Sequence, residues 1–185
     1  IYLDYNSTTP VDPAVLNEML PFFTQYFGNA ASKTHKYGWE ASHAVEQARI
    51  RVASMINAEP DEIIFTSGST ESINIALNGL AGIYGHKRKT IITAPTEHKA
   101  ILDTCDMLAG KGYQIRYLSI DREGNIDLNE LDELLNEEVL SVCLMMANNE
   151  TGVIHPAAEI GKRCHDKNVF FFTDATQAAG KLHID

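Results

Sequence analysis

A carboxylate that follows a very apolar stretch is the first candidate for chemistry in this sequence. The segment FFFTDATQAAG, residues 170–180, begins with three phenylalanines, reaches Asp174 and places Gln177 three residues later. Three successive phenylalanines predict a strand that is buried on both faces. A buried carboxylate without a partner is unfavourable, so Asp174 requires a cation. Because no basic residue adjoins it before Lys181, we expect a cation that does not belong to the protein.

A run of small residues could bind phosphate. In IIFTSGSTESINIALNG, residues 63–79, a strand is expected to end near Thr66 and a helix to begin around Thr70. Free N–H groups at a helix N-terminus, together with the hydroxyls of Ser69 and Thr70, form a site for phosphate. The segment contains neither a Walker loop nor GxGxxG. Alternatively, Ser69 or Thr70 only caps the helix, and the spacing does not decide between the two.

Two further polar positions follow predicted strands. His98, in APTEHKA, lies at an expected helix start, where the positive end of the helix favours a neutral imidazole. Asn148 and Asn149, in MMANNETG, precede a glycine turn. Taken singly, these residues also fit a surface or capping histidine and a pair of ordinary turn amides.

The elements that would position these side chains alternate along the chain. Helical periodicity lies between five apolar segments that predict strands: EIIFT (62–66), KTIITA (89–94), YQIRYLSI (113–120), VLSVCLMMA (139–147) and VFFFTD (169–174). This alternation predicts an α/β fold with a mostly parallel sheet and helices on both faces. In such sheets ligands bind beyond the carboxyl ends of the strands, which is where the candidate residues lie.

The N-terminal part is expected to be an extended segment followed by helices. Residues 1–12 end at Asp12, which would cap a helix that begins with Pro13. Apolar residues recur with helical spacing between residues 39 and 57. At 185 residues, the chain has the length of one domain.

Composition argues against several classes of protein. Fifteen basic and 25 acidic residues give a net charge of −10, which disfavours binding to nucleic acid or an anionic membrane. No apolar stretch approaches the ~20 residues that span a bilayer, and no secretory leader is expected before Ile1. The three cysteines are odd in number and outside any CxxC pattern, which predicts a reducing, cytoplasmic compartment and no metal site.

The strand ends together suggest one ligand. They offer a phosphate site, a histidine, an amide and a carboxylate followed by a glutamine. A ligand with a phosphate at one end and a protonatable ring nitrogen at the other would use all of them. Pyridoxal 5′-phosphate (PLP) is such a ligand, and Asp174 would pair with its pyridinium nitrogen. The required cation would then be the cofactor, whose ring the carboxylate keeps protonated as an electron sink.

Six segments resemble, in order and spacing, the N-terminal half of cysteine desulfurases, which are fold-type-I PLP enzymes of the class-V aminotransferase family. They are YLDYNSTTPVDP, FGNAASKTHKYGWEA, IIFTSGSTESIN, TEHKAILDTC, ANNETGVIHP and TDATQAAGKLHID. The resemblance implies that residues 13–185 are part of the large PLP-binding domain. It implies conversion of L-cysteine to L-alanine, with sulfur transferred as an enzyme persulfide for iron–sulfur cluster assembly or tRNA thiolation. A homodimer and an iron–sulfur scaffold or other sulfur-acceptor protein are implied as partners.

The resemblance also implies a role for each candidate residue. Ser69 and Thr70 would hold the phosphate, and His98 would stack on the ring and move protons. Asn149 would lie near the substrate and the phenolic oxygen of PLP, to which Gln177 would hydrogen-bond. For the carboxylate of the TDATQ segment it implies the pairing with the ring nitrogen described above.

The rest of the family's machinery is expected after Asp185. The Schiff-base lysine belongs to a Ser-x-His-Lys motif, and the persulfide cysteine and the arginine that binds the substrate carboxylate belong to a small C-terminal domain. Lys99 and Lys181 do not match the lysine position, and none of the three cysteines matches the nucleophile.

Alternatives of two kinds stay open. Within the same fold, the protein could be a selenocysteine lyase or an aminotransferase-like PLP enzyme, and the cysteine loop after residue 185 would distinguish these. Outside enzymes, it could be a non-catalytic binding module that lacks the Schiff-base lysine. The length of the encoded protein would test this last alternative.

Overall fold

The computed structural model describes residues 1–184 and contains two compact units. The first unit comprises Ile1–Phe65 with His183 and Ile184, and the second comprises Thr66–Leu182. Every candidate site residue identified from the sequence lies in the second unit.

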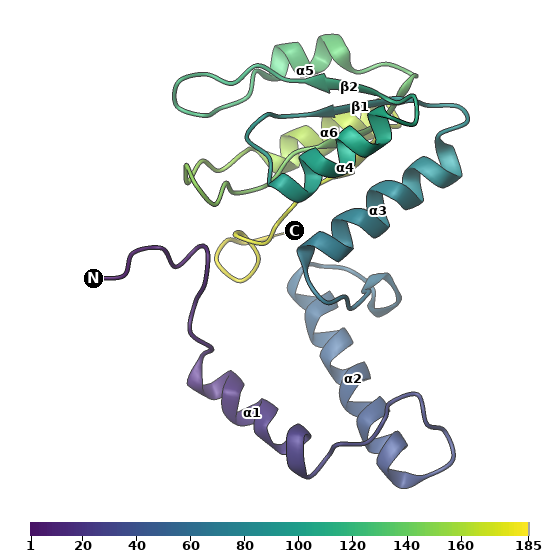
Figure 1. Ribbon diagram of the computed structural model, residues 1–185, viewed down its shortest axis with the longest axis vertical. Helices are drawn as coiled ribbons and strands as arrows, with labels where there is room; N and C mark the ends of the chain where they lie inside the picture. Colours follow the sequence, from purple (N-terminus) through teal and green to yellow (C-terminus); the bar gives the residue numbers. More distant parts are fainter. Residues whose placement is uncertain (185) are drawn as a thin grey trace. The chain divides into compact units, whose positions relative to one another are not determined.

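The first unit is helical. Helix α1 (Pro13–Thr24) begins as predicted: Asp12 accepts a hydrogen bond from the Ala14 N–H at 2.7 Å, and proline occupies the first helical position. Helix α2 (Lys36–Met55) confirms the helix predicted around residues 39–57 and starts one turn earlier. Figure 1 shows both helices. Among the described residues, no helix is both long and apolar enough to cross a membrane.

The strand predicted at residues 62–66 is wrong. A 3₁₀ helix, η1 (Pro60–Glu62), is followed by an irregular segment in which Ile64 is 72% exposed. The Ile63 carbonyl accepts a hydrogen bond from the side chain of Arg49. An apolar segment becomes a strand only when a neighbouring backbone pairs with it, and no described strand does so here.

The second unit contains a four-stranded parallel sheet. Its strands lie in the order β2-β1-β3-β4. They confirm the other four predicted strands and are β1 (Thr90–Thr93), β2 (Gln114–Tyr117), β3 (Val139–Cys143) and β4 (Phe170–Phe172). The helices of the unit are α3 (Ser69–Tyr84), α4 (Lys99–Ala109), α5 (Leu128–Leu134) and α6 (Ala157–Asp166) (Figure 1).

Helices cover both faces of this sheet, as predicted. Helices α3 and α4 pack on one face in a cluster that includes Ile91 and Leu140, while α5 and α6 pack on the other with Ile92 and Val142. Thr90 pairs with Val139 but Ile91 pairs with Ser141, so Leu140 is an extra residue in β3. This bulge re-aims the later side chains of β3.

Strand β4 lies at an edge of the described sheet, and the prediction that it is buried on both faces is wrong. It pairs with β3 alone among the described strands. Phe171 and Phe172 contact the two opposite hydrophobic clusters, but Phe170 is 37% exposed and packs its ring against Tyr84 at 4.9 Å between centroids. An edge strand has a neighbouring strand on one side only, so three successive phenylalanines do not guarantee full burial.

The strand order reverses direction between β1 and β3. The chain passes from β1 through α4 to β2 on one side, and β3 then lies on the other side of β1. At such a switch point, the turns that leave the carboxyl ends of the two strands diverge and leave a crevice for ligands. The relevant turns here are residues 94–98 and 144–153.

Candidate active site

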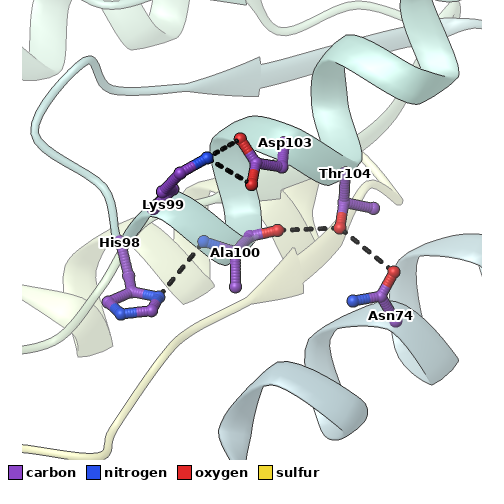
Figure 2. Close-up of polar contacts among 6 residues, drawn as sticks. All are labelled: Asn74, His98, Lys99, Ala100, Asp103 and Thr104. Atoms are coloured by element: carbon purple, nitrogen blue, oxygen red, sulfur yellow. Dashed lines mark hydrogen bonds and ion pairs between the residues drawn. The ribbon is translucent and has the colours of Figure 1, made fainter.

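His98 caps the helix that follows β1. Its Nδ1 accepts a hydrogen bond from the Ala100 N–H at 3.2 Å, at the first turn of α4 (Figure 2). The capping role considered from the sequence is therefore present. A neutral imidazole that accepts at Nδ1 carries its proton on Nε2, so Nε2 is the nitrogen able to exchange a proton with a ligand.

The first turns of α4 contact α3, and the side chain of Lys99 on α4 is engaged in an ion pair. Lys99 forms an exposed ion pair with Asp103 at 2.7 Å. The Thr104 hydroxyl donates to the Ala100 carbonyl at 2.7 Å and lies 3.4 Å from Oδ1 of Asn74 on α3. Figure 2 shows these contacts together; among them, the one between Thr104 and Asn74 joins α4 to α3.

The N-terminus of α3 is capped by Gly68, so neither Ser69 nor Thr70 is the N-cap. Helix α3 begins at Ser69, one residue earlier than expected. The turn before it is held by Glu71, which accepts from both the backbone N–H and the hydroxyl of Ser67 at 2.6 and 2.7 Å. These bonds lower the pKa of Glu71. The first N–H groups of α3 lack partners within the helix and are suited to an anion.

The turn after β3 is organised by Asn148. Its Nδ2 donates to the Thr96 carbonyl at 2.9 Å, and its Oδ1 accepts from the N–H groups of Glu150 and Thr151 at 2.8 and 2.9 Å. Asn148 is buried, whereas Asn149 is only half-buried in the same turn. The two asparagines therefore differ: the first holds the turn and the second is the one that a ligand could reach.

Asp174 and Gln177 follow β4, as predicted. Asp174 is half-buried, and its Oδ1 accepts from the Thr176 N–H at 2.9 Å. It forms no ion pair with any residue from 1 to 184. The expectation of a fully buried carboxylate is wrong because the strand before it lies at an edge. Lys181 donates to Oε1 of Gln177 at 2.9 Å, so Gln177 is the hydrogen-bond partner of this lysine.

Glu97 was missed by the sequence analysis. It is 5% exposed, and its Oε1 accepts from the Met145 N–H at 2.7 Å. Burial, and to a smaller extent the charge of Asp174, raises the pKa of Glu97 to about 8, although the bond from Met145 opposes this. The rule that drew attention to Asp174, a carboxylate just after an apolar strand, applies equally to Glu97 in APTEHKA.

Several buried polar atoms at these strand ends have no hydrogen-bond partner. The described residues contain five such atoms, and four of them lie on the last residue of β1 or after β1 or β4: Thr93 Oγ1, Thr96 Oγ1, Glu97 Oε2 and Thr173 Oγ1. A buried unpaired polar group costs about 1–3 kcal/mol. Their concentration at the carboxyl ends of the strands fits a polar ligand with several donors and acceptors, such as PLP.

The chain matches the aminotransferase class-V family over residues 1–185. It belongs to that family. This class-V aminotransferase chain is 51% identical over 185 residues to the mitochondrial cysteine desulfurase of Drosophila melanogaster, covering 100% of this chain and 40% of the relative. It is 50% identical over the same length to the cysteine desulfurase IscS of Rickettsia felis, of which it covers 45%. The chain thus spans less than half the length of these relatives.

Solved structures of this type confirm the predicted fold. A NifS-like protein superposes with a TM-score of 0.95 at 40% identity, over 100% of this chain and 51% of that one. The structure described as SspA in complex with cysteine superposes with a TM-score of 0.94 at 35% identity, over 100% of this chain and 53% of that one. The family resemblance drawn from the six segments is likewise confirmed.

Proposed function

We propose that this chain is the cofactor-binding part of a PLP-dependent cysteine desulfurase that converts L-cysteine to L-alanine and passes the sulfur on as a persulfide. The observation that carries the proposal is the group of unpartnered buried polar atoms at the carboxyl ends of β1 and β4, where Glu97 is close enough to Asp174 to sense its charge. The names of relatives about 50% identical over the whole chain support the choice of substrate.

We propose that residues of this chain bind both polar ends of PLP. The N–H groups and hydroxyls of Ser69 and Thr70, at the start of α3, would bind the phosphate. Asp174 would pair with the ring nitrogen, and Gln177 would donate to the phenolic oxygen. When bound, PLP supplies an electron sink for charge that develops on the substrate's α-carbon.

His98 and Asn149 complete the proposed site. His98 would lie over the ring with Nδ1 engaged by α4, so that Nε2 is left to hold or deliver a proton. Asn149 would orient the substrate from the turn after β3. The contact between Asn148 and Thr96 keeps the two turns that carry these residues at a fixed separation.

We propose that the rest of the full-length protein carries the groups that form covalent bonds with cofactor and substrate. In this chain Lys99 is paired with Asp103, and burial raises the pKa of both Cys105 and Cys164 to about 11. We therefore propose that a lysine and a cysteine after residue 185, in the remaining large domain and a small C-terminal domain, supply the Schiff base and the persulfide.

Iron–sulfur cluster assembly or tRNA thiolation is the proposed destination of the sulfur, with a scaffold or sulfur-acceptor protein as the recipient and a homodimer as the assembled form. The IscS name of one relative supports the first. We propose a cytoplasmic location, although one relative is named as mitochondrial. Sedimentation of the native protein tests the homodimer, and cell fractionation tests the location.

The experiment uses the full-length protein with PLP. Appearance of the cofactor's absorbance, together with equal amounts of alanine and persulfide or sulfide from L-cysteine, is expected. Parallel reactions with L-selenocysteine and with amino donors plus keto acids test the lyase and aminotransferase alternatives. Binding of PLP without turnover of any of these substrates would favour the binding module instead.

A further inference from the structure

Two hydrogen bonds join the turns that leave β1 and β3, and each turn contributes one of the two side chains involved. Glu97 accepts at Oε1 from the Met145 N–H at 2.7 Å, and Asn148 donates from Nδ2 to the Thr96 carbonyl at 2.9 Å. At the switch point, where the turns after β1 and β3 diverge, two side chains therefore link these turns. One of the two, Glu97, carries a titratable group.

The segment that Glu97 holds also binds the backbone of Asp174. The Met146 N–H donates to the Asp174 carbonyl at 2.9 Å, and the Leu144 N–H donates to the Phe172 carbonyl at 3.1 Å. A continuous path thus runs from the Glu97 side chain through residues 145–146 to Asp174. On the other side Glu97 directly precedes His98, the cap of α4.

We propose that Glu97 is a positioning residue for Asp174 and His98: as a neutral carboxylic acid it joins the turns that carry them and adds no charge of its own beside the carboxylate at the ring nitrogen. The assignment of the ring nitrogen rests on the proposed function. The tie between the turns and the electrostatic contact with Asp174 are properties of the protein without any ligand.

Burial and the charge of Asp174 favour the neutral form of Glu97, and only the hydrogen bond from Met145 opposes it. Glu97 is 5% exposed, and the charge of Asp174 adds to the effect of burial in raising its pKa. The thiols of Cys105 on α4 and Cys143 on β3 face it, and each has its own pKa raised, first by burial. His98 adjoins it in the chain, and the ring of His155 bonds the Met145 carbonyl at 2.9 Å. No described residue forms an ion pair with Glu97.

The hydrogen bonds also say where the proton lies. Because Oε1 accepts from a backbone N–H, the hydroxyl of the neutral acid is on Oε2, which has no partner among residues 1–184. A buried hydroxyl donor without a partner is one that a bound ligand or an ordered water can satisfy. An ionised Glu97 would instead place a second negative charge beside Asp174.

The first test is infrared titration of the full-length protein without cofactor. The band of a protonated carboxylic acid is expected at pH 7, with loss near pH 8. It should be absent in Glu97→Gln and retained in the control Glu137→Gln, which changes an exposed glutamate. In Asp174→Asn the midpoint should move to lower pH, because a repelling charge has been removed. A band that is absent at pH 7, or a midpoint that Asp174→Asn leaves in place, overturns the proposal.

The second test measures the affinity for PLP. Glu97→Ala leaves the Met145 N–H without its acceptor and should weaken PLP binding at least about fivefold, the equivalent of one lost buried hydrogen-bond partner. Glu97→Gln keeps an acceptor and a neutral group, so it should restore the affinity at pH 7. Equal affinity in Glu97→Ala and wild type contradicts a positioning role. If the wild-type protein binds no PLP, the proposed function fails, while the infrared test still decides the coupling between Glu97 and Asp174.

Discussion

Asn148, and not its neighbour Asn149, joins the turn after β3 to the turn after β1, through a 2.9 Å bond from Nδ2 to the Thr96 carbonyl. With the two backbone N–H groups bonded to Oδ1, one side chain makes three hydrogen bonds from a buried position. This amide therefore joins the two turns together with the bond between Met145 and Glu97.

Asn148→Ala should lower the free energy of unfolding by about 3 kcal/mol, because it removes three part-buried hydrogen bonds that each contribute about 1 kcal/mol. Asn129→Ala, at an exposed position of α5, is the matched control and should change stability by less than about 0.5 kcal/mol. Urea unfolding of the two variants measures the difference. Equal stabilities would mean that water replaces the side chain at no cost.

Asp174→Asn should preserve the fold and reduce cysteine turnover about 100-fold, which corresponds to about 2.7 kcal/mol in the activation barrier. The amide oxygen can still accept from the Thr176 N–H, so only the charge is removed. Alanine formation in the full-length enzyme gives the rate, and circular dichroism reports the fold. A rate near that of the wild type would remove Asp174 from the ring nitrogen.

His98→Asn should separate the capping role from the chemical one. Asparagine is a good N-cap, so α4 should keep its stability, whereas His98→Ala should lose about 1 kcal/mol. Both variants lose the imidazole, and both should slow the proton-transfer step about 10²–10⁴-fold. Rapid-mixing spectra after addition of L-cysteine follow that step. Unchanged kinetics in His98→Asn would leave the histidine a cap only.

The pH dependence of stability should carry the signature of Glu97. Its pKa in the folded protein, about 8, lies above the ordinary value of 4.5, so the folded state holds a proton that the unfolded state releases. The stabilisation by this proton is complete below about pH 4.5 and is lost as the pH rises through 8. Relative to Glu97→Gln, the wild type should lose roughly 1 kcal/mol per pH unit across that window. A constant difference between the two proteins would contradict the raised pKa.

None of the three cysteines should receive the transferred sulfur as a persulfide. All are buried, and burial raises the pKa of each thiol, so the reactive thiolate is scarce at neutral pH. Mass spectrometry after reaction with L-cysteine should find the persulfide on a cysteine outside residues 1–185. Iodoacetamide should label Cys105, Cys143 and Cys164 only after unfolding. A persulfide on one of them would place the sulfur chemistry within this chain.

Local sequence patterns were sufficient for the features that depend on neighbours in the chain. Asp12 and Pro13 identify the start of α1 because a cap and a fixed φ act within one turn. Alternation of apolar strands with periodic helices identifies the parallel sheet, since such strands need cover on both faces. The rule that ligands bind at the carboxyl ends of strands then selects His98 and Asp174 without coordinates.

Tertiary structure decided what depends on partners far away in the chain. EIIFT and FFF are both apolar, yet the first has no paired strand and the second lies at an edge, because a strand forms only against another backbone. Asn148 and Asn149 are identical in type, and only the carbonyl of Thr96, 52 residues earlier, distinguishes them. Glu97 follows an apolar strand in the sequence, but that pattern does not say whether its carboxyl group is buried. The fold buries its carboxyl group and brings Asp174 close enough to repel its charge, and both raise its pKa although the Met145 N–H opposes them.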